Sequence, residues 1–375
     1  MRIFLAWHNT LQNKKRTAAA VAGITFSVLL IFMQLGFLQT ARTNSTIVYN
    51  YFDFDLAIVS SRFESLDTAW GFDKARLVHV RVVPGVASAA ALDYDRVRWG
   101  DPKLKGHTSA TMMLGYDLTP DFVPQADRAG LASIVRKDTL MLDRFSNPSF
   151  GEQRIGREVT LDGHPVALAA LFGMGVGFQA DGAVMVNLET FQAINGRDPR
   201  DETFALVRAS PGVAPELLKA RLREALPGDV VIFTKPELVS RERDYYVNVK
   251  PVGIMFRAGA FVAYCVGAVI LYQVLAGEIS NRLREMATLK AVGFTPWYIY
   301  GVGVQQALLF ATMSYVPAFI LSLGTFWLVY WASHIPMFMT WSLAGFVALL
   351  TLVMTSVSSF LALQKVKRAD PADLF

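Results

Sequence analysis

The chain has 375 residues, of which 53% are hydrophobic and 18% are charged, against about 25% charged residues in a typical soluble domain. No Asp, Glu, Lys or Arg occurs from Ala291 to Gln364, which excludes a soluble fold for this part because a soluble surface of that length carries charges. The formal net charge of +5 comes from short basic segments beside apolar runs, so it reflects membrane orientation and indicates no nucleic-acid partner. The single cysteine, Cys265, excludes intrachain disulfides and CxxC motifs.

The first predicted membrane helix is the uncharged run 17–38, which follows Lys14, Lys15 and Arg16. A helix of this length crosses ~30 Å of hydrocarbon. A secretory signal peptide is the alternative, but its apolar core has only about 7–15 residues and ends at a small-residue cleavage site. We therefore interpret the run as a retained anchor. Three further apolar runs predict membrane helices at 254–276, 302–332 and 341–363.

The basic residues predict the orientation of these helices. They precede the first helix and follow the second and the fourth, whereas the turn between the third and fourth has none. By the positive-inside rule, we expect both termini to lie in the cytoplasm. The predicted organisation is a cytoplasmic amphipathic segment 1–16, transmembrane helices 17–38, 254–276, 302–332 and 341–363, an extracytoplasmic domain 39–253, a cytoplasmic coupling helix 277–301, an outer turn 333–340 and a cytoplasmic tail 364–375.

The extracytoplasmic domain is predicted to be of the α/β class. Near its end, the spacing of Leu218 and Leu222 predicts an amphipathic helix at 215–226 between two strands, and a similar strand–helix–strand order occurs near its start. This repeat predicts a split ferredoxin-like layer, with a strand-rich insertion at about residues 100–200. The fold class is therefore an α-helical membrane protein with one transmembrane helix before the inserted domain and three after it. The predicted strands are 56–59, 86–99, 109–116, 159–161, 166–171, 183–186, 203–207 and 230–233.

Residue combinations typical of catalytic or metal sites do not occur in the sequence. None of the five histidines has the helical spacing of a zinc protease, and no GxSxG motif is found. The glycine-rich stretch 171–178 lacks the order of a nucleotide-binding loop, so we interpret it as a packed or flexible β-segment, with a partner-contacting lip as the alternative. Asp93 and Asp95 alternate on a predicted strand beside Arg96 and Arg98, which we interpret as a solvated face. We expect neither an enzymatic activity nor a cofactor in this chain.

Three small residues recur at a spacing of four in the second membrane helix: Gly259, Ala263 and Gly267. Small side chains at this spacing let helix backbones approach closely. They are candidates for helix packing or for a dimer contact, with ordinary membrane-helix composition as the alternative.

The segment after the second membrane helix has the pattern of a short amphipathic helix. Apolar residues from Ile279 to Val292 recur at spacings of four and three, and Gly293 is placed to end the helix. Such a helix either lies on the lipid surface or transmits motion from a cytoplasmic motor to the adjoining membrane helix.

The run Arg284-Glu285-Met286-Ala287-Thr288-Leu289-Lys290-Ala291-Val292-Gly293 resembles the cytoplasmic coupling segment of MacB/FtsX/LolC-like ABC transporter permeases. The C-terminal residues 367–375 are similar to the ending of the same family. Segments 31–37, 177–182, 250–256 and 369–373 resemble its DevC-type branch of exporter permeases. The resemblance implies that a partner ATPase contacts Leu283, Arg284, Glu285, Met286, Leu289, Lys290 and Gly293.

The resemblance also implies a function. A DevC-like permease forms a homodimer in membrane lipid and recruits a separate ABC ATPase, which binds the ATP and Mg²⁺ that this chain does not. A periplasmic adaptor and a TolC-like outer-membrane channel complete the export path for an amphiphilic, lipid- or glycolipid-like substrate. The movement is passed on mechanically through the extracytoplasmic domain. The alternatives are an FtsX-like scaffold that relays ATPase motion to an external partner and a LolC-like lipoprotein-sorting permease.

Overall fold

The computed structural model describes residues 14–101, 108–175, 180–281, 296–333, 335 and 337–368. The chain divides into two compact units. The helical unit consists of Met1–Gln39, Pro251–Ala332 and Met337–Phe375, and the sheet unit consists of Thr40–Lys250 and Ser333–Pro336. The segment predicted as an inserted domain makes up nearly all of the sheet unit.

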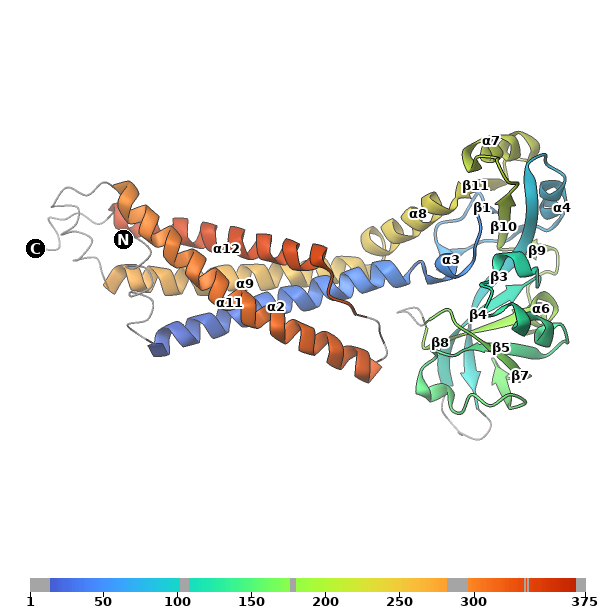
Figure 1. Cartoon of the computed structure of the whole chain (residues 1–375), viewed down its shortest axis with the longest axis horizontal. Helices are drawn as coiled ribbons and strands as arrows, with labels where there is room; N and C mark the ends of the chain where they lie inside the picture. The colour runs from blue at the N-terminus through green and yellow to red at the C-terminus, as the bar shows by residue number, and fades with distance from the viewer. Residues whose placement is uncertain are drawn as a thin grey trace, which may run out of the picture. The chain divides into compact units, whose positions relative to one another are not determined.

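The helical unit contains four long helices, α2 (Lys14–Asn44), α9 (Pro251–Asn281), α11 (Pro296–Ser333) and α12 (Trp341–Arg368) (Figure 1). Among the described residues, four stretches are long and apolar enough to cross a membrane: Thr17–Asn44, Pro251–Gly277, Gln305–Ala332 and Trp341–Ala362. Four membrane helices were expected from the sequence. Large apolar side chains such as Phe261 and Phe360 are more than 60% exposed, as suits contact with lipid.

The aromatic residues beside the predicted outer turn are also exposed. Trp331 is 68% exposed near the end of α11, and Trp341 is 90% exposed at the start of α12. Indole rings favour the membrane–water interface because they combine an apolar body with one polar N–H. Their position indicates where this end of the helical unit meets the membrane surface.

The sheet unit is built on nine strands in the order β11-β1-β10-β3-β4-β8-β5-β7-β6. In the first part of the sheet, β1 pairs antiparallel with both β10 and β11, and β10 pairs antiparallel with β3. In the second part, β4–β8 and β5–β7 are parallel pairs, so the sheet is mixed. The strands are β1 (Leu56–Ser60), β3 (Val86–Gly100), β4 (Thr108–Tyr116), β5 (Thr139–Asp143), β6 (Glu158–Leu161), β7 (His164–Phe172), β8 (Gly182–Asn187), β10 (Phe204–Ala209) and β11 (Val230–Thr234), with β2 (Phe72–Asp73) and β9 (Asp201–Glu202) as a separate pair.

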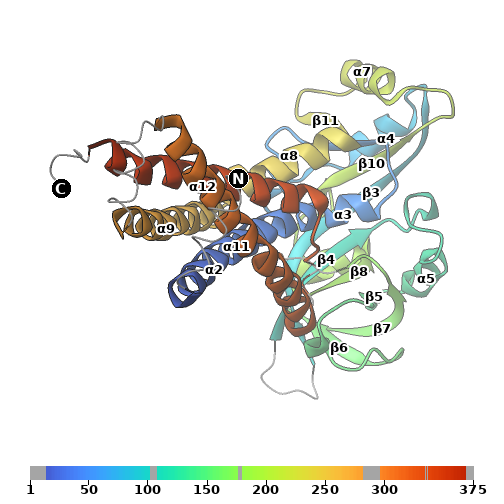
Figure 2. The same cartoon turned by 60° about the vertical axis from the view of Figure 1, so that its left-hand side comes forward.

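Short helices cover the two faces of this sheet (Figure 2). One helix lies between β1 and β3 in sequence and another between β10 and β11, and both pack on the same core. A longer helix follows β11 and leads towards α9. The helices are α3 (Ile47–Tyr51), α4 (Ala75–Arg81), α5 (Arg128–Leu131), α6 (Leu188–Asn195), α7 (Pro215–Ala225) and α8 (Lys235–Asn248), with 3₁₀ turns η1 (Leu66–Thr68), η2 (Pro120–Phe122), η3 (Ala132–Ile134) and η4 (Pro148–Phe150).

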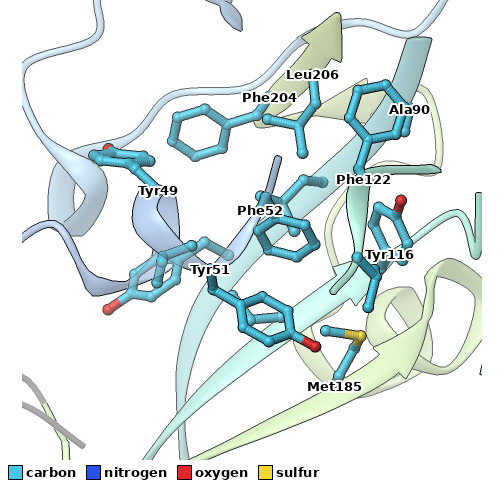
Figure 3. Close-up of a cluster of buried hydrophobic side chains, with 14 of the residues drawn as sticks. Tyr49, Tyr51, Phe52, Ala90, Tyr116, Phe122, Met185, Phe204 and Leu206 are labelled. Carbon is cyan, nitrogen blue, oxygen red and sulfur yellow. The ribbon is translucent and has the colours of Figure 1, made fainter. Parts of the chain in front are cut away.

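The alternation of side chains along the central strands divides the interior into separate cores. On β1, Leu56 and Ile58 face a core with α4 and α7, whereas Ala57 and Val59 face the opposite core. This follows from the period of two in a β-strand. The second core is rich in aromatic rings, among them Tyr49 and Phe52 (Figure 3). It also includes Leu238, so α3 and α8 both contribute side chains to it.

Most of the predicted strands are confirmed within one or two residues. The hairpin turn Asp162-Gly163 has a positive φ at both positions (48° and 87°), as a tight turn between twisted antiparallel strands requires. The sequence patterns did not predict β5 and α8, nor the shorter elements β2, β9, α3, α5 and α6. The buried side chains of α8 include Leu238, Glu242 and Tyr246 at spacings of four, and only one of the three is purely apolar. The hydrophobic periodicity that reveals a helix is therefore absent from α8.

Candidate functional site

The residues predicted to contact an ATPase, from Leu283 to Gly293, lie outside the residues that the structure describes. Their role stays a prediction. The structure does describe the helix that leads to them, α9, and the segments that join the sheet unit to α2 and α9. The contacts at these places are described below.

The small residues of α9 lie against other helices of the same chain. A Cβ added at Gly259 would lie 2.6 Å from Cδ of Gln34 on α2, and one added at Gly267 would lie 2.7 Å from Sδ of Met354 on α12. Ala263, between them, is 4% exposed. Glycine therefore leaves room for the Gln34 side chain at position 259 and for Met354 and Ser27 at position 267, which lets α9 lie close to α2 and α12. A further role in a dimer contact stays a prediction.

Other contacts join α2 to the rest of the helical unit. The rings of Phe37 and Phe256 are stacked, with centroids 5.4 Å apart. Between α2 and α11, the Thr25 hydroxyl donates to the Ser314 carbonyl at 3.2 Å. Close backbone approach, ring stacking and interhelical hydrogen bonds all act in the absence of a hydrophobic driving force within lipid. The helix before the sheet unit is thus packed with helices that follow it.

In the sheet unit, the least expected side chain is Glu242 of α8, which is fully buried. Its carboxylate accepts a hydrogen bond from the Tyr49 hydroxyl of α3 at 3.0 Å. It also accepts the Leu66 backbone N–H of η1, at 3.2 Å and 3.0 Å to its two oxygens. One side chain therefore ties together α8, α3 and η1.

The neighbouring Asp67 extends these ties to the sheet. Its carboxylate accepts from Arg96 on β3 at 2.7 Å, from the Tyr246 hydroxyl on α8 at 2.6 Å and from the Tyr94 hydroxyl at 3.3 Å. The ammonium of Lys250 lies 3.3 Å from the same carboxylate, and α9 begins at the next residue. We call this group the Glu242–Asp67 cluster; its members are Tyr49, Asp67, Tyr94, Arg96, Glu242, Tyr246 and Lys250.

Burial controls the electrostatics of the cluster. It raises the pKa of Glu242 to about 8, with Asp67 adding to the rise and Lys250, the Leu66 N–H and the Tyr49 hydroxyl opposing it. Burial also raises the pKa of Tyr49 well above its ordinary value, so this phenol stays a donor. A carboxyl that changes charge near neutral pH lies among these groups, and no feature of the sequence around Glu242 points to it.

A second buried group holds the first part of the glycine-rich stretch. Asp127 accepts from the Tyr51 hydroxyl, from Arg144 and from the Gly173 N–H, at 3.2 Å, 2.8 Å and 3.0 Å. Asp143 accepts from the Gly175 N–H at 2.7 Å, and its burial raises its pKa to about 6. Backbone N–H groups of residues 173–175 therefore donate hydrogen bonds to two carboxylates, which hold this segment in place.

The interpretation of Asp93 as part of a solvated face is wrong. Asp93 is 2% exposed and accepts from both the N–H and the hydroxyl of Thr203, at 2.7 Å and 2.8 Å. It is buried because β3 is an interior strand of the sheet and Thr203, just before the neighbouring strand β10, lies against its carboxylate. Glu202 is 1% exposed, has no hydrogen-bond partner among the described residues and lies 3.5 Å from Lys74. Burial raises the pKa of Glu202 to about 7.

No group of three or more His, Cys, Asp or Glu side chains that could hold a metal ion occurs in the described part of the chain. The described polar clusters join secondary-structure elements to one another. Among the described residues, four helices are apolar enough to span a membrane, and most of the sheet unit lies between the first and the second of them in the chain. These features indicate a multi-pass membrane protein with an inserted structured domain.

Comparison with known families assigns this protein to a family. A MacB-like periplasmic core domain matches residues 17–225, and an FtsX-like permease C-terminal domain matches residues 257–371. The chain belongs to the MacB/FtsX-like family of ABC transporter permeases. No curated protein matches the chain at a significant level.

Two solved structures are similar to the chain over about half of its length. The periplasmic region of MacB from Actinobacillus actinomycetemcomitans is 11% identical, with a TM-score of 0.37, over 48% of this chain and 88% of that one. The extracellular domain of the noncanonic ABC-type transporter YknZ from Gram-positive bacteria is 12% identical, with a TM-score of 0.33, over 48% of this chain and 98% of that one.

Proposed function

We propose that this chain is the permease subunit of an ATP-driven exporter of the DevC/MacB-like type. It forms a homodimer in the bacterial inner membrane, with both termini in the cytoplasm, and exports an amphiphilic, lipid- or glycolipid-like substrate. A separate ABC ATPase binds the ATP and Mg²⁺, and a periplasmic adaptor and a TolC-like channel carry the substrate outwards. The observation that supports this most directly is the succession of the two family matches along one chain.

The proposed mechanism is mechanical. The ATPase moves the predicted coupling helix, which follows α9, and α9 moves α2 because Gly259 and Gly267 seat it closely against its neighbours. Chain continuity passes the movement from α2 to α3 and from α9 to α8. Both α3 and α8 are rooted in the aromatic core of the sheet unit, so the sheet unit moves as a body. Its antiparallel part, in the order β11-β1-β10-β3, supports a split ferredoxin-like layer as the body that receives the movement.

The test is made at the coupling segment. Leu289→Asp puts a charge on the predicted apolar face and should abolish both ATPase association and export, and Glu285→Lys should weaken association. Thr288→Asp, one residue away and outside the apolar face, is the matched control. Each permease is co-expressed with its candidate ATPase; co-purification and export of amphiphilic lipid into the medium are measured. Wild-type association and export in both coupling variants would refute the proposed mechanism and favour the lipid-lying alternative.

A further inference from the structure

The two connections between the sheet unit and the long helices are bonded to one another inside the sheet unit. α3 follows α2 after two residues, and α8 ends two residues before α9 begins. The Tyr49 hydroxyl of α3 reaches the Glu242 carboxylate of α8 at 3.0 Å, and this bond is fully buried. Any separation of α3 from α8 must break it.

The same carboxylate fixes α8 to η1 through the Leu66 N–H. A buried N–H that loses its acceptor is costly to leave unpaired, so this bond is either made or replaced by a bond to water. Asp67, one residue on, holds Arg96 of β3 and Tyr246 of α8. The contact between α8 and the sheet therefore contains two neighbouring carboxylates, and separating α8 from the sheet would break the hydrogen bonds of both.

We propose that Glu242 is a proton-controlled joint that locks α8 to α3 and η1 when it is protonated and releases them when it ionises. As a coupling element this joint rests on the proposed function, because it would set how firmly the sheet unit follows α2 and α9. The groups that face it are Tyr49 from α3, Asp67 from η1, Tyr94 and Arg96 from β3, Tyr246 from α8, and Lys250.

The direction of the control follows from these neighbours. Burial has the largest effect and opposes the charged form of Glu242, and the negative charge of Asp67 adds to it. Together they outweigh the Leu66 N–H, the Tyr49 hydroxyl and Lys250, which favour the charged form. Ionisation therefore favours the open joint, in which the carboxylate reaches water. The nearby Tyr49 and Tyr94 stay neutral because burial raises the pKa of each phenol above its usual range. Glu242, with its raised pKa, therefore changes charge near neutral pH.

The size of the effect can be worked out by linkage. The closed joint holds Glu242 with a pKa of about 8, against an ordinary value of 4.5. The equilibrium constant for opening the joint then rises as the pH increases from 4.5 to about 8, and it no longer changes at higher pH. Between pH 6 and pH 9 the expected increase is roughly 90-fold.

The experiment is amide hydrogen exchange on the full-length chain in lipid nanodiscs from pH 5 to pH 9, corrected for the intrinsic exchange rate at each pH. The readout is the protection factor of peptides that contain the Leu66 N–H and of peptides from α8. In the wild-type chain, both should lose protection together by roughly 90-fold between pH 6 and pH 9. Glu242→Gln keeps an acceptor for Leu66 and removes the titration, so its profile should be flat. Asp244→Asn, an exposed acid on the same helix, is the matched control and should keep the wild-type profile.

A flat wild-type profile would overturn the joint, and it would do so even if Glu242→Gln failed to insert. A variant Glu242→Gln with the wild-type pH profile would also overturn it, since another group would then carry the titration. Association of the ATPase with the wild-type chain, measured on the same preparations, tests the proposed function separately. If the wild-type chain did not bind the ATPase, the proposed permease role would be refuted, whereas the hydrogen-exchange result for the joint would still stand.

Discussion

Gly→Ala substitutions are expected to change the stability in opposite directions at different glycines of the helical unit, because the space around each added Cβ differs. In a helix interior, Gly→Ala alone stabilises by roughly 0.5–1 kcal/mol, because alanine has less backbone freedom to lose. That gain is expected at Gly345 of α12 and Gly324 of α11, where an added Cβ meets nothing within 4 Å. At Gly267 the new Cβ would lie 2.7 Å from Sδ of Met354 and 3.0 Å from Cβ of Ser27. Overlap in a packed interior costs about 1–3 kcal/mol and exceeds the gain.

The variants should differ in stability according to whether the atom that the new Cβ overlaps can move away. Ser27 Cβ cannot move without its backbone, whereas the atoms within 3 Å of a Cβ at Gly259 are the end of the Gln34 side chain, which can rotate away. Gly267→Ala should therefore destabilise by about 1–2 kcal/mol. Gly259→Ala should be close to neutral, and Gly345→Ala should stabilise slightly.

The assay is the midpoint of thermal unfolding of each purified full-length variant in detergent, with the monodisperse fraction after heating as a second measurement. Gly345→Ala and Gly324→Ala serve as controls for the substitution itself. If Gly267→Ala raised the midpoint of thermal unfolding as much as Gly345→Ala does, α9 would not be held against Ser27 and Met354. The proposed movement of α9 together with α2 would then be contradicted.

Three further predictions concern the sheet unit and the topology. Because the folded-state pKa of Glu202 is raised from 4.5 to about 7, wild-type stability should fall by about 3 kcal/mol as pH rises through this window. Glu202→Met should lack that part of the fall, as measured by urea unfolding at pH 4.5 and pH 8; an identical pH dependence in both proteins would contradict the assignment. Reporter fusions at residues 150 and 288 should report opposite sides of the membrane, and the same side for both would refute the predicted orientation. The segment 39–254 expressed alone should fold with no metal and no disulfide, and the far-UV spectrum of a disordered chain would count against this.

Local pattern was enough to predict the long apolar helices and most strands. A membrane helix needs about 20 consecutive apolar residues, and the interior strands alternate or run apolar between turn residues, so each is visible within a short window of sequence. The signal of the Asp162-Gly163 turn is equally local, because a two-residue hairpin turn needs positive φ angles and Asp and Gly adopt them more readily than other residues. The family resemblance rested on runs of the same kind, and the matches to residues 17–225 and 257–371 confirm its coarser level.

What the sequence alone determined about this protein is therefore its set of elements and its class as a multi-pass permease of the MacB/FtsX-like family. Only the tertiary structure decided which polar residues are buried. Asp93 and Glu242 have charged sequence neighbours and look like surface residues, yet both are buried, because strand order and helix placement close over them. The partners of Glu242 lie 176 and 193 residues away in sequence, at Leu66 and Tyr49. No local pattern encodes such a meeting, since it depends on how β1, α3 and α8 are brought together by the whole sheet.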